Sequence, residues 1–437
     1  MRQANRSRLR CAALALLAPW LFPSAAAAQP PRPSVAAADP VRCAPGNGGL
    51  RLPAGFCAAI VADSVGPARH IVAAPNGDVF VAIRNRRGAR GGILALRDTT
   101  GDGAADVATR FGENGGTGIA LRAGYLYFAT DDAVLRYPLP AGSLTPAGPP
   151  DTIVAGLPYE RSHSAKSIAV TDRDLFVNIG SPSNVCTARN APGTRGPDPC
   201  PERETRAGIW RFDPDRTGQR QQDGVRYATG IRNAVALAIH PTNGGLYAVQ
   251  HGRDALSVLW PDLFTHEKSA ETPSEELIRV DRGDDFGWPY CYHDLELGRK
   301  VLAPEYGGDG RDAGRCADVE EPILAFPGHW APDGLLFYTG SQFPARYRGG
   351  AFIAFHGSWN RAPMPQDGYR VVFVPFEGDA PAGGYEDFAT GFAGADVSPR
   401  GAAHRPVGLA QAPDGSLYIT DDQGGRIWRV VYAAGRR

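Results

Sequence analysis

His163 is well placed to move a proton, because a neutral imidazole is the usual general base near pH 7. It lies in the segment RSHSAKSIAV, residues 161–170, directly before an apolar run, and Lys166 follows three positions later. Beyond that run the chain continues with Ser181 and Asn184. These residues favour a polar site with a base and a cation. The alternative is a lone histidine on a surface loop.

Arginines also stand just outside apolar runs. Arg232 and Asn233 precede one such run, Arg361 follows another in HGSWNR, and Arg405 begins a third in HRPVG. Guanidinium groups bind carboxylates in a bidentate way, so arginines that converge on one opening would suit a carboxylate-bearing ligand. The alternative is a set of ordinary surface arginines in an arginine-rich chain.

Three segments could bind a hard cation. Gly252 in QHGR lets backbone carbonyls approach a ligand closely, and residues 274–294 combine carboxylates with a rigid FGWPYCY turn. The segment DTTGDGAAD, residues 98–106, has aspartate spacings close to those of a calcium loop. It lacks the third acidic position and the closing glutamate, so a hairpin turn is favoured there over a calcium site.

These segments must be positioned by β-structure. Six times an apolar run, a tight turn such as P-D-G and a second apolar run recur, which is typical of β-hairpins. The six units begin at Ile71, Ile119, Ile168, Val235, Ala331 and Val407. A hairpin alone cannot bury its apolar face, so the units must stack, and the pattern predicts an all-β, six-bladed β-propeller. Such a fold gathers loops from every blade around one axial mouth.

The chain begins with charged residues, a short apolar stretch and small residues, which predicts a secretory signal peptide over residues 1–28. A flexible lead-in is expected over 29–45 and the propeller over 46–437, with loop insertions at 182–204 and 254–275. No later segment resembles a membrane span. We therefore expect a periplasmic or secreted protein.

Six of the seven cysteines remain after removal of the signal peptide, and an even number in an exported chain favours disulfides. Sequence order suggests the pairs Cys43–Cys57, Cys186–Cys200 and Cys291–Cys316, although six cysteines allow fifteen pairings. The 46 basic and 46 acidic residues balance, so no general attraction to nucleic acid or anionic membrane is expected.

Together these segments resemble the glucose/sorbosone dehydrogenase family, the soluble aldose dehydrogenases that depend on pyrroloquinoline quinone (PQQ), and most closely its sorbosone-dehydrogenase-like branch. The similar stretches occur in the family's order and are RLPAGF, HSAKS with GSPSNVC, GIRNAVALA with QHG, EELIRVDRGDDFGWPYCY, HGSWNR and HRPVGLAQAPDGSLYITDD. The resemblance implies that the propeller binds PQQ at its axial mouth.

The resemblance also implies roles for individual residues. His163 would take the proton from the anomeric hydroxyl of a sugar while hydride passes to the quinone C5. The cofactor and its calcium would be held by residues matching the family's positions: Arg232, Arg405 and Lys166 or Arg361 for the carboxylates, Asn184 and Asn233 for other cofactor contacts, and the carbonyls of Gly252 and Arg253 for calcium. A further structural calcium would be held by Glu276 and the backbone of Phe286.

The first hypothesis is therefore a quinoprotein oxidoreductase that acts on aldoses or related hydroxy-aldehydes and passes electrons to a cytochrome or a soluble acceptor. A calcium-dependent lactonase is a second, since such hydrolases also use six-bladed propellers with an axial cation. A non-catalytic propeller that binds glycans or a partner protein is the third.

Overall fold

The computed structural model describes residues 41–86, 90–160, 162–187 and 191–433. The expected signal peptide, most of the lead-in and Cys11 lie outside the described residues. Within the described ranges, no helix is both long and apolar enough to cross a membrane.

Six four-stranded antiparallel sheets form the body of the protein, and we number them as blades in chain order. Blade 1 consists of β2 (Ala68–Ala73), β3 (Val79–Ile83), β4 (Gly92–Arg97) and β5 (Val107–Phe111). Blade 2 consists of β6 (Gly116–Arg122), β7 (Tyr125–Thr130), β8 (Val134–Pro138) and β9 (Asp151–Val154). Blade 3 consists of β10 (Ile168–Val170), β11 (Leu175–Ile179), β12 (Gly208–Phe212) and β13 (Val225–Thr229). Blade 4 consists of β14 (Ala236–Ile239), β15 (Leu246–Gln250), β16 (Glu275–Val280) and β19 (Leu324–Phe326). Blade 5 consists of β20 (Pro332–Phe337), β21 (Ala351–Phe355), β22 (Arg370–Val374) and β25 (Glu386–Ala389). Blade 6 consists of β26 (Pro406–Gln411), β27 (Leu417–Asp421), β28 (Ile427–Tyr432) and β1 (Phe56–Ala62).

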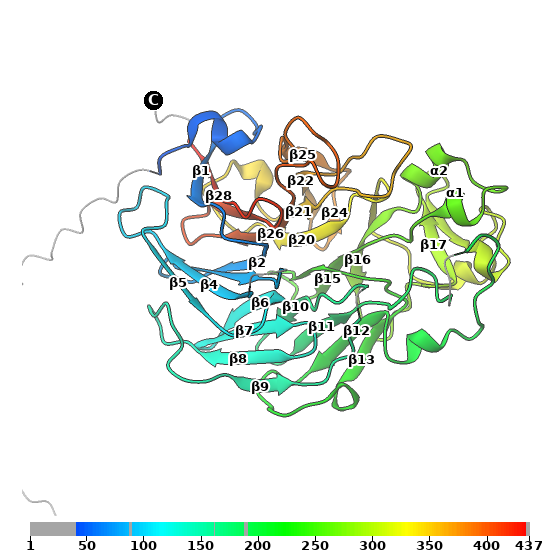
Figure 1. Ribbon diagram of the computed structural model, residues 1–437, viewed down its shortest axis with the longest axis horizontal. Helices are drawn as coiled ribbons and strands as arrows, with labels where there is room; N and C mark the ends of the chain where they lie inside the picture. The colour runs from blue at the N-terminus through cyan, green and yellow to red at the C-terminus, as the bar shows by residue number, and fades with distance from the viewer. Residues whose placement is uncertain (1–40, 87–89, 161, 188–190, 434–437) are drawn as a thin grey trace, which may run out of the picture. The chain divides into compact units, whose positions relative to one another are not determined.

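The six blades close into a ring. The first strands of blades 1 to 5 (β2, β6, β10, β14 and β20) contact one another in succession, and β26 of blade 6 contacts both β20 and β2. Of these inner strands, β2, β6, β10, β20 and β26 surround the centre in Figure 1, while β5, β9 and β13 lie at the periphery. The six-bladed propeller expected from the hairpin pattern is confirmed. Strand β1 pairs with β28, so the start of the propeller completes its last blade.

Burial along the strands explains why the sequence reads as apolar hairpins. The second strand of a blade lies between neighbouring blades, so all five residues of β3 and of β15 are buried. The outer strand β5, at the edge of its sheet, contains only exposed and half-buried residues. Continuous apolar runs therefore mark the second strands, and mixed runs mark the rim.

One predicted turn is wrong. Pro332-Asp333-Gly334 does not close a hairpin but begins the inner strand β20, with a register shift between Pro332 and Gly334. A Cβ on Gly334 would lie 2.1 Å from the carbonyl oxygen of Val407, so the glycine lets β20 pack closely against β26. The shift leaves Asp333 buried at the axis. The similar P-D-G at 413–415 does form a turn, with Gly415 at φ 86°.

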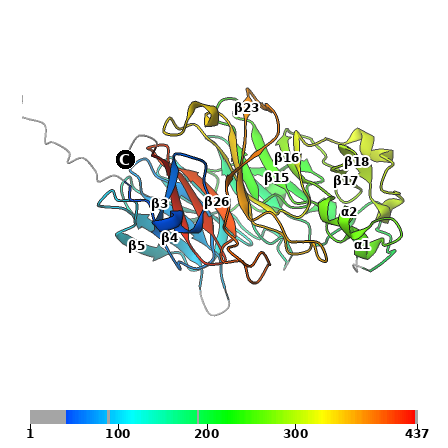
Figure 2. The ribbon, with the colours of Figure 1, turned by 90° about the horizontal axis from the view of Figure 1, so that it is seen from above.

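The insertions contain more structure than the sequence predicts. The expected loop 254–275 holds two short helices, α1 (Leu256–Leu259) and α2 (His266–Glu271). A further hairpin, β17 (Cys291–Asp294) with β18 (Arg299–Leu302), stands between β16 and β19, and a small one, β23 (Phe376–Glu377) with β24 (Ala380–Pro381), follows β22. In both ribbon views the helices and the β17–β18 hairpin lie together beyond one side of the propeller (Figures 1 and 2).

Three disulfides join the pairs that sequence order suggests, Cys43–Cys57, Cys186–Cys200 and Cys291–Cys316. Each closes a local loop, so each restricts the unfolded chain over a short span. Three disulfides are typical of a protein from an oxidising compartment outside the cytosol.

The closure of blade 6 can be tested at Phe56 in β1. Its ring packs edge-on against Phe343, Tyr347 and Phe388, which ties the start of the propeller to blade 5. We expect Phe56→Ala to lower the free energy of unfolding by about 3–5 kcal/mol, measured by urea denaturation. The control is Val107→Ala on the outer strand β5, where 41% of the residue is exposed. Equal, small losses in the two variants would contradict this role of β1.

Candidate active site

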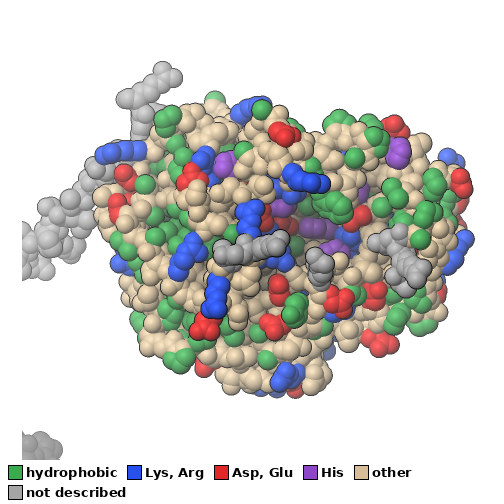
Figure 3. Space-filling view, in the orientation of Figure 1, with side chains coloured by type: hydrophobic (Ala, Val, Ile, Leu, Met, Phe, Trp, Pro, Cys, Tyr) green, Lys and Arg blue, Asp and Glu red, His purple; other side chains and the backbone are tan. Residues whose placement is uncertain are grey.

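A cavity of about 690 Å³ opens at the axial mouth of the propeller. Figure 3 shows a hollow near the middle of this face where histidine, basic and acidic side chains gather. Six of the residues predicted from the sequence line it: His163, Asn184, Arg232, Asn233, Gly252 and Arg405. The loops of separate blades therefore do converge on one polar site.

His163 lies in the loop before β10 and has a left-handed backbone, with φ 50°. Its Nδ1–H donates to the carbonyl oxygen of Ser181 at 2.8 Å, which leaves Nε2 as the nitrogen with the free lone pair. Burial and the nearby Arg232 charge lower the pKa of His163 to about 3. The imidazole is thus neutral at physiological pH and can accept a proton at Nε2.

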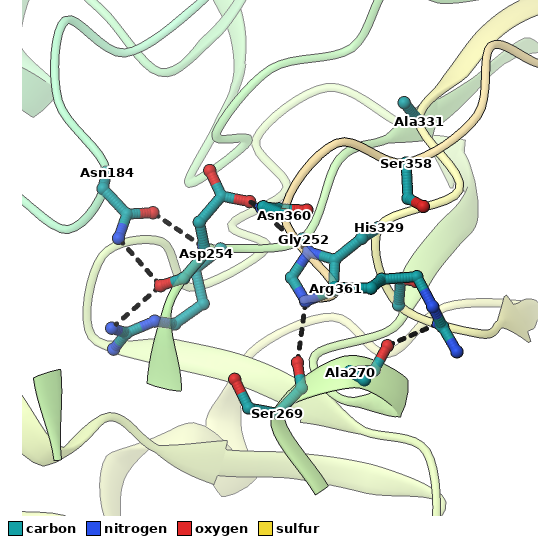
Figure 4. A network of polar contacts seen from close by, with 12 residues as sticks. Asn184, Gly252, Asp254, Ser269, Ala270, His329, Ala331, Ser358, Asn360 and Arg361 are labelled. Atoms are coloured by element: carbon teal, nitrogen blue, oxygen red, sulfur yellow. Dashed lines mark hydrogen bonds and ion pairs between the residues drawn. The ribbon is translucent and has the colours of Figure 1, made fainter. Parts of the chain in front are cut away.

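Asp254, which follows β15, holds one wall of the cavity together (Figure 4). Arg232 donates from Nη2 to Asp254 Oδ2 at 2.7 Å and from Nη1 to the carbonyl oxygen of Gly252 at 2.9 Å. Asn184 accepts from the backbone N–H of Asp254 at 2.8 Å. Burial alone would raise the pKa of Asp254, but the Arg232 charge holds it well below its ordinary value. Arg232 is therefore oriented and its charge is matched within the protein.

The cavity lining also carries a second charged group of residues that was not predicted from the sequence. Arg69 binds both Asp333, at 3.1 Å, and Asp422, at 2.6 Å. His356 Nε2 lies 2.7 Å from Asp422 Oδ1, and His251 Nε2 lies 3.3 Å from Asp333 Oδ1. All five residues line the cavity. Arg69, like Arg232, has its charge balanced by carboxylates.

Two other cavity arginines have no such balance. Arg84 donates from Nη2 to the hydroxyl of Ser164 at 2.6 Å, and Arg405 donates from Nε to the carbonyl oxygen of His356 at 3.0 Å. Within the described part of the chain, neither guanidinium lies within ion-pair distance of a carboxylate. Since a charge away from bulk water is costly unless it is paired, these arginines favour an anionic ligand in the cavity.

Lys166 and Arg361, predicted to bind the cofactor, do not line the cavity. Lys166 is fully buried and donates to the carbonyl oxygen of Ser164 at 2.8 Å; burial lowers the pKa of this lysine to about 8. Arg361 donates to the carbonyl oxygens of Ala270 at 2.6 Å and Gly328 at 3.0 Å, and so ties α2 to blade 5 (Figure 4). Both side chains therefore donate hydrogen bonds to backbone carbonyl oxygens and do not line the cavity themselves.

A shared position along the blades could have located the missed residues. In four blades, the residue directly after the second strand lines the cavity: Arg84 after β3, His251 after β15, His356 after β21 and Asp422 after β27. The second strands of a propeller point the same way, so the residues that follow them meet at one face.

The predicted metal ligands fall into two groups. Gly252 lines the cavity; its N–H donates to Glu275 at 2.9 Å and its carbonyl oxygen accepts from Arg232, leaving one lone pair. The Arg253 side chain turns inward to a buried ion pair with Glu305. A calcium site at the carbonyls of Gly252 and Arg253 stays a prediction.

Glu276 and Phe286 do not fit a metal ion. The ammonium group of Lys300 lies 2.6 Å from the carbonyl oxygen of Phe286 and 3.2 Å from a carboxylate oxygen of Glu276. In residues 98–106, Asp98 and Asp106 accept hydrogen bonds from backbone N–H groups of the β4–β5 connection, as the hairpin-turn interpretation expects.

The geometry does not favour the lactonase hypothesis, which needs acidic side chains converging on a metal. Among the described residues, the one group of three or more His, Cys, Asp or Glu ligand atoms within 4.8 Å of one another is Cys186, Cys200 and Glu202. Its two cysteines form a disulfide. The carboxylates of the cavity are instead committed to arginine, histidine or backbone N–H groups.

Comparison with known proteins places the chain in a family. Residues 50–433 match the family model described as TrAA12-like. The chain belongs to this family. A curated relative, the PQQ-dependent pyranose dehydrogenase of Coprinopsis cinerea, is 26% identical over 332 residues, which cover 65% of this chain and 41% of the relative. The chain thus matches less than two thirds of the length of that relative.

Two solved structures share the fold. The holo form of the pyranose dehydrogenase PQQ domain from Coprinopsis cinerea superposes with a TM-score of 0.70 and 22% identity, covering 87% of this chain and 97% of that one. The calcium structure of the Trichoderma reesei family AA12 enzyme gives 0.71 and 21%, covering 88% and 97%.

The half-buried, neutral state of His163 predicts a pH-dependent stability. Below its ordinary pKa of 6.5, the His163 imidazole binds a proton in the unfolded chain but stays neutral in the native protein, where its pKa is about 3. We expect the stability of the wild type relative to His163→Gln to fall as pH drops from 6.5 toward 3, by up to about 1.4 kcal/mol per pH unit. Denaturant unfolding across this range measures it. The control variant is His266→Gln on α2. A stability difference between the wild type and His163→Gln that stays constant across this pH range would contradict the neutral state of His163.

Proposed function

We propose that this chain is a PQQ-dependent dehydrogenase that oxidises aldose sugars or related hydroxy-aldehydes. The observation that carries the proposal is a cavity lined both by a neutral histidine, His163, and by two arginines, Arg84 and Arg405, that have no carboxylate partner among the described residues. The names of the curated relative and the solved neighbour, both PQQ-dependent pyranose dehydrogenases, support it. Sorbosone-like substrates remain within the proposed range.

The residues of the cavity fit PQQ, a planar tricarboxylate. Its volume of about 690 Å³ lies in the range of small-molecule sites. Arg84 and Arg405 would bind carboxylates, and Arg232 and Asn233, which also line the cavity, would make further contacts to the cofactor. Two further lining atoms, Asn360 Oδ1 and Thr187 Oγ1, are buried without a hydrogen-bond partner among the described residues. Polar atoms of this kind favour a polar ligand.

The protein's own contribution to the reaction is to hold the proton. PQQ, when bound, supplies an acceptor for two electrons. Nε2 of His163 would accept the proton of the substrate hydroxyl, while the hydrogen bond from Nδ1–H to Ser181 keeps the ring in the required tautomer. The anionic cofactor would also raise the pKa of His163 above its value in the free protein, which strengthens it as a base.

The remaining proposals concern calcium, the sugar and electron transfer. The carbonyl oxygen of Gly252 would supply one ligand to a calcium ion, which takes oxygen ligands from backbone carbonyls. Trp359 lies at the rim of the cavity, 63% exposed, and offers an apolar face to a sugar ring. Electrons would pass to an external acceptor such as a cytochrome, in the periplasm or outside the cell.

The proposal is tested by adding PQQ and calcium to the purified mature chain and following aldose-dependent reduction of a dye. We expect turnover that depends on both PQQ and the aldose. PQQ bound without turnover on any aldose or hydroxy-aldehyde would contradict the dehydrogenase assignment, and absence of PQQ binding would contradict the cofactor.

The role of His163 predicts a specific loss. His163→Gln should lower kcat by about 10²–10⁴-fold, the usual contribution of a general base, while PQQ affinity changes little. The control is His266→Gln on α2, a histidine that does not line the cavity, and this variant should turn over as the wild type does. Near-normal turnover of His163→Gln would remove this residue from proton transfer.

A further inference from the structure

A buried ammonium group lies where the β17–β18 hairpin meets β16 of blade 4, and it does not line the cavity. Lys300, on β18, is one of three lysines in the chain, and its side chain is 0% exposed. Its Nζ donates to the carbonyl oxygen of Phe286 at 2.6 Å and lies 3.2 Å from Glu276 Oε2. The ring of Phe286 is also near, with its centroid 5.2 Å from Nζ. Lys300 is thus surrounded by a carboxylate, a carbonyl oxygen and an aromatic ring.

These partners are those that a cation needs. Glu276 is 4% exposed and, apart from Lys300, contacts the neutral side chain of Gln250, so its negative charge requires a positive one beside it. An ammonium group is a compact point charge, closer to a metal ion in shape than a planar guanidinium. The choice of lysine in an arginine-rich chain fits a position that admits a small, round cation.

We propose that the ammonium group of Lys300 is a built-in cation that takes the place of a structural metal ion between Glu276 and Phe286. A calcium ion at this position would require six to eight oxygen ligands and would lie against a positive charge. The protein therefore has no calcium site there, and the β17–β18 hairpin supplies the charge instead. This inference does not depend on the proposed cofactor.

The built-in cation also reaches the cavity wall. Gln250 donates from Nε2 to the same Glu276 oxygen at 3.0 Å, and its Oε1 accepts from the backbone N–H of Arg232 at 3.2 Å. Lys300 is accordingly a positioning residue, which fixes Glu276 and, through Gln250, the backbone that carries Arg232. Among the described residues, the hydrogen-bond and ion-pair partners of Lys300 do not line the cavity.

The experiment compares bound calcium and melting temperature in PQQ-free protein. The variants are Lys300→Met, Glu276→Gln and the double variant, and the control is Lys268→Met, which removes a lysine on α2 that pairs with Asp294. We expect Lys300→Met to melt about 5–10 °C lower, because Glu276 is left buried and unpaired. Millimolar calcium should restore part of this loss in Lys300→Met and none in the double variant or in Lys268→Met.

The calcium content decides the proposal directly. We expect the wild type, Glu276→Gln and the double variant to bind the same number of calcium ions, measured by elemental analysis after dialysis. A wild type that binds one calcium ion more than the double variant would overturn the proposal. So would a Lys300→Met variant whose melting temperature responds to calcium no more than that of the wild type. If Lys300→Met fails to fold, the comparison of wild type with the double variant still decides.

Discussion

The carboxylate of Asp254 connects three blades at the axial mouth, and the geometry of the cavity depends on it. Its own carboxylate oxygens face Arg232, Asn360 and His329, while its backbone is held by the side chain of Asn184. These partners belong to the loops of blades 3, 4 and 5. Because a half-buried carboxylate is stabilised when its charge is matched, contact between the three loops stabilises Asp254 in this position.

The same requirement divides five cations of the structure into two groups. Arg232, Arg69 and Lys300 each face a buried or half-buried carboxylate, and their charges belong to the fold. Among the described residues, the hydrogen-bond acceptors of the Arg84 and Arg405 side chains are a hydroxyl and backbone carbonyl oxygens and not carboxylates, so their charges are available to an anion that enters the cavity. The site is rigid where charge is matched and receptive to anions where it is not. A tricarboxylate cofactor would supply the negative charge that Arg84 and Arg405 lack.

The sequence predicted much of this arrangement because the propeller is written in short-range patterns. Apolar hairpins predicted the six blades, and an even set of closely spaced cysteines suggested the three disulfides. The polar residues beside those hairpins included His163 and Arg232. Arg84 and Asp333 were missed since one follows a strand without a motif and the other stands in a P-D-G that looks like a turn. The pairing of Lys300 with Glu276 could not be predicted, because the two residues lie 24 positions apart in sequence and come together only through the β17–β18 insertion.

The central claim is that Arg84 and Arg405 hold an anionic cofactor, and calorimetric titration of the purified chain with PQQ tests it most directly. The account predicts that Arg84→Gln and Arg405→Gln each weaken binding by about 10–100-fold, the worth of a hydrogen bond to a charged group. Arg346→Gln, at an exposed arginine of blade 5, should bind as the wild type does. Unchanged affinity in both cavity variants, or no binding by the wild type, would contradict the account.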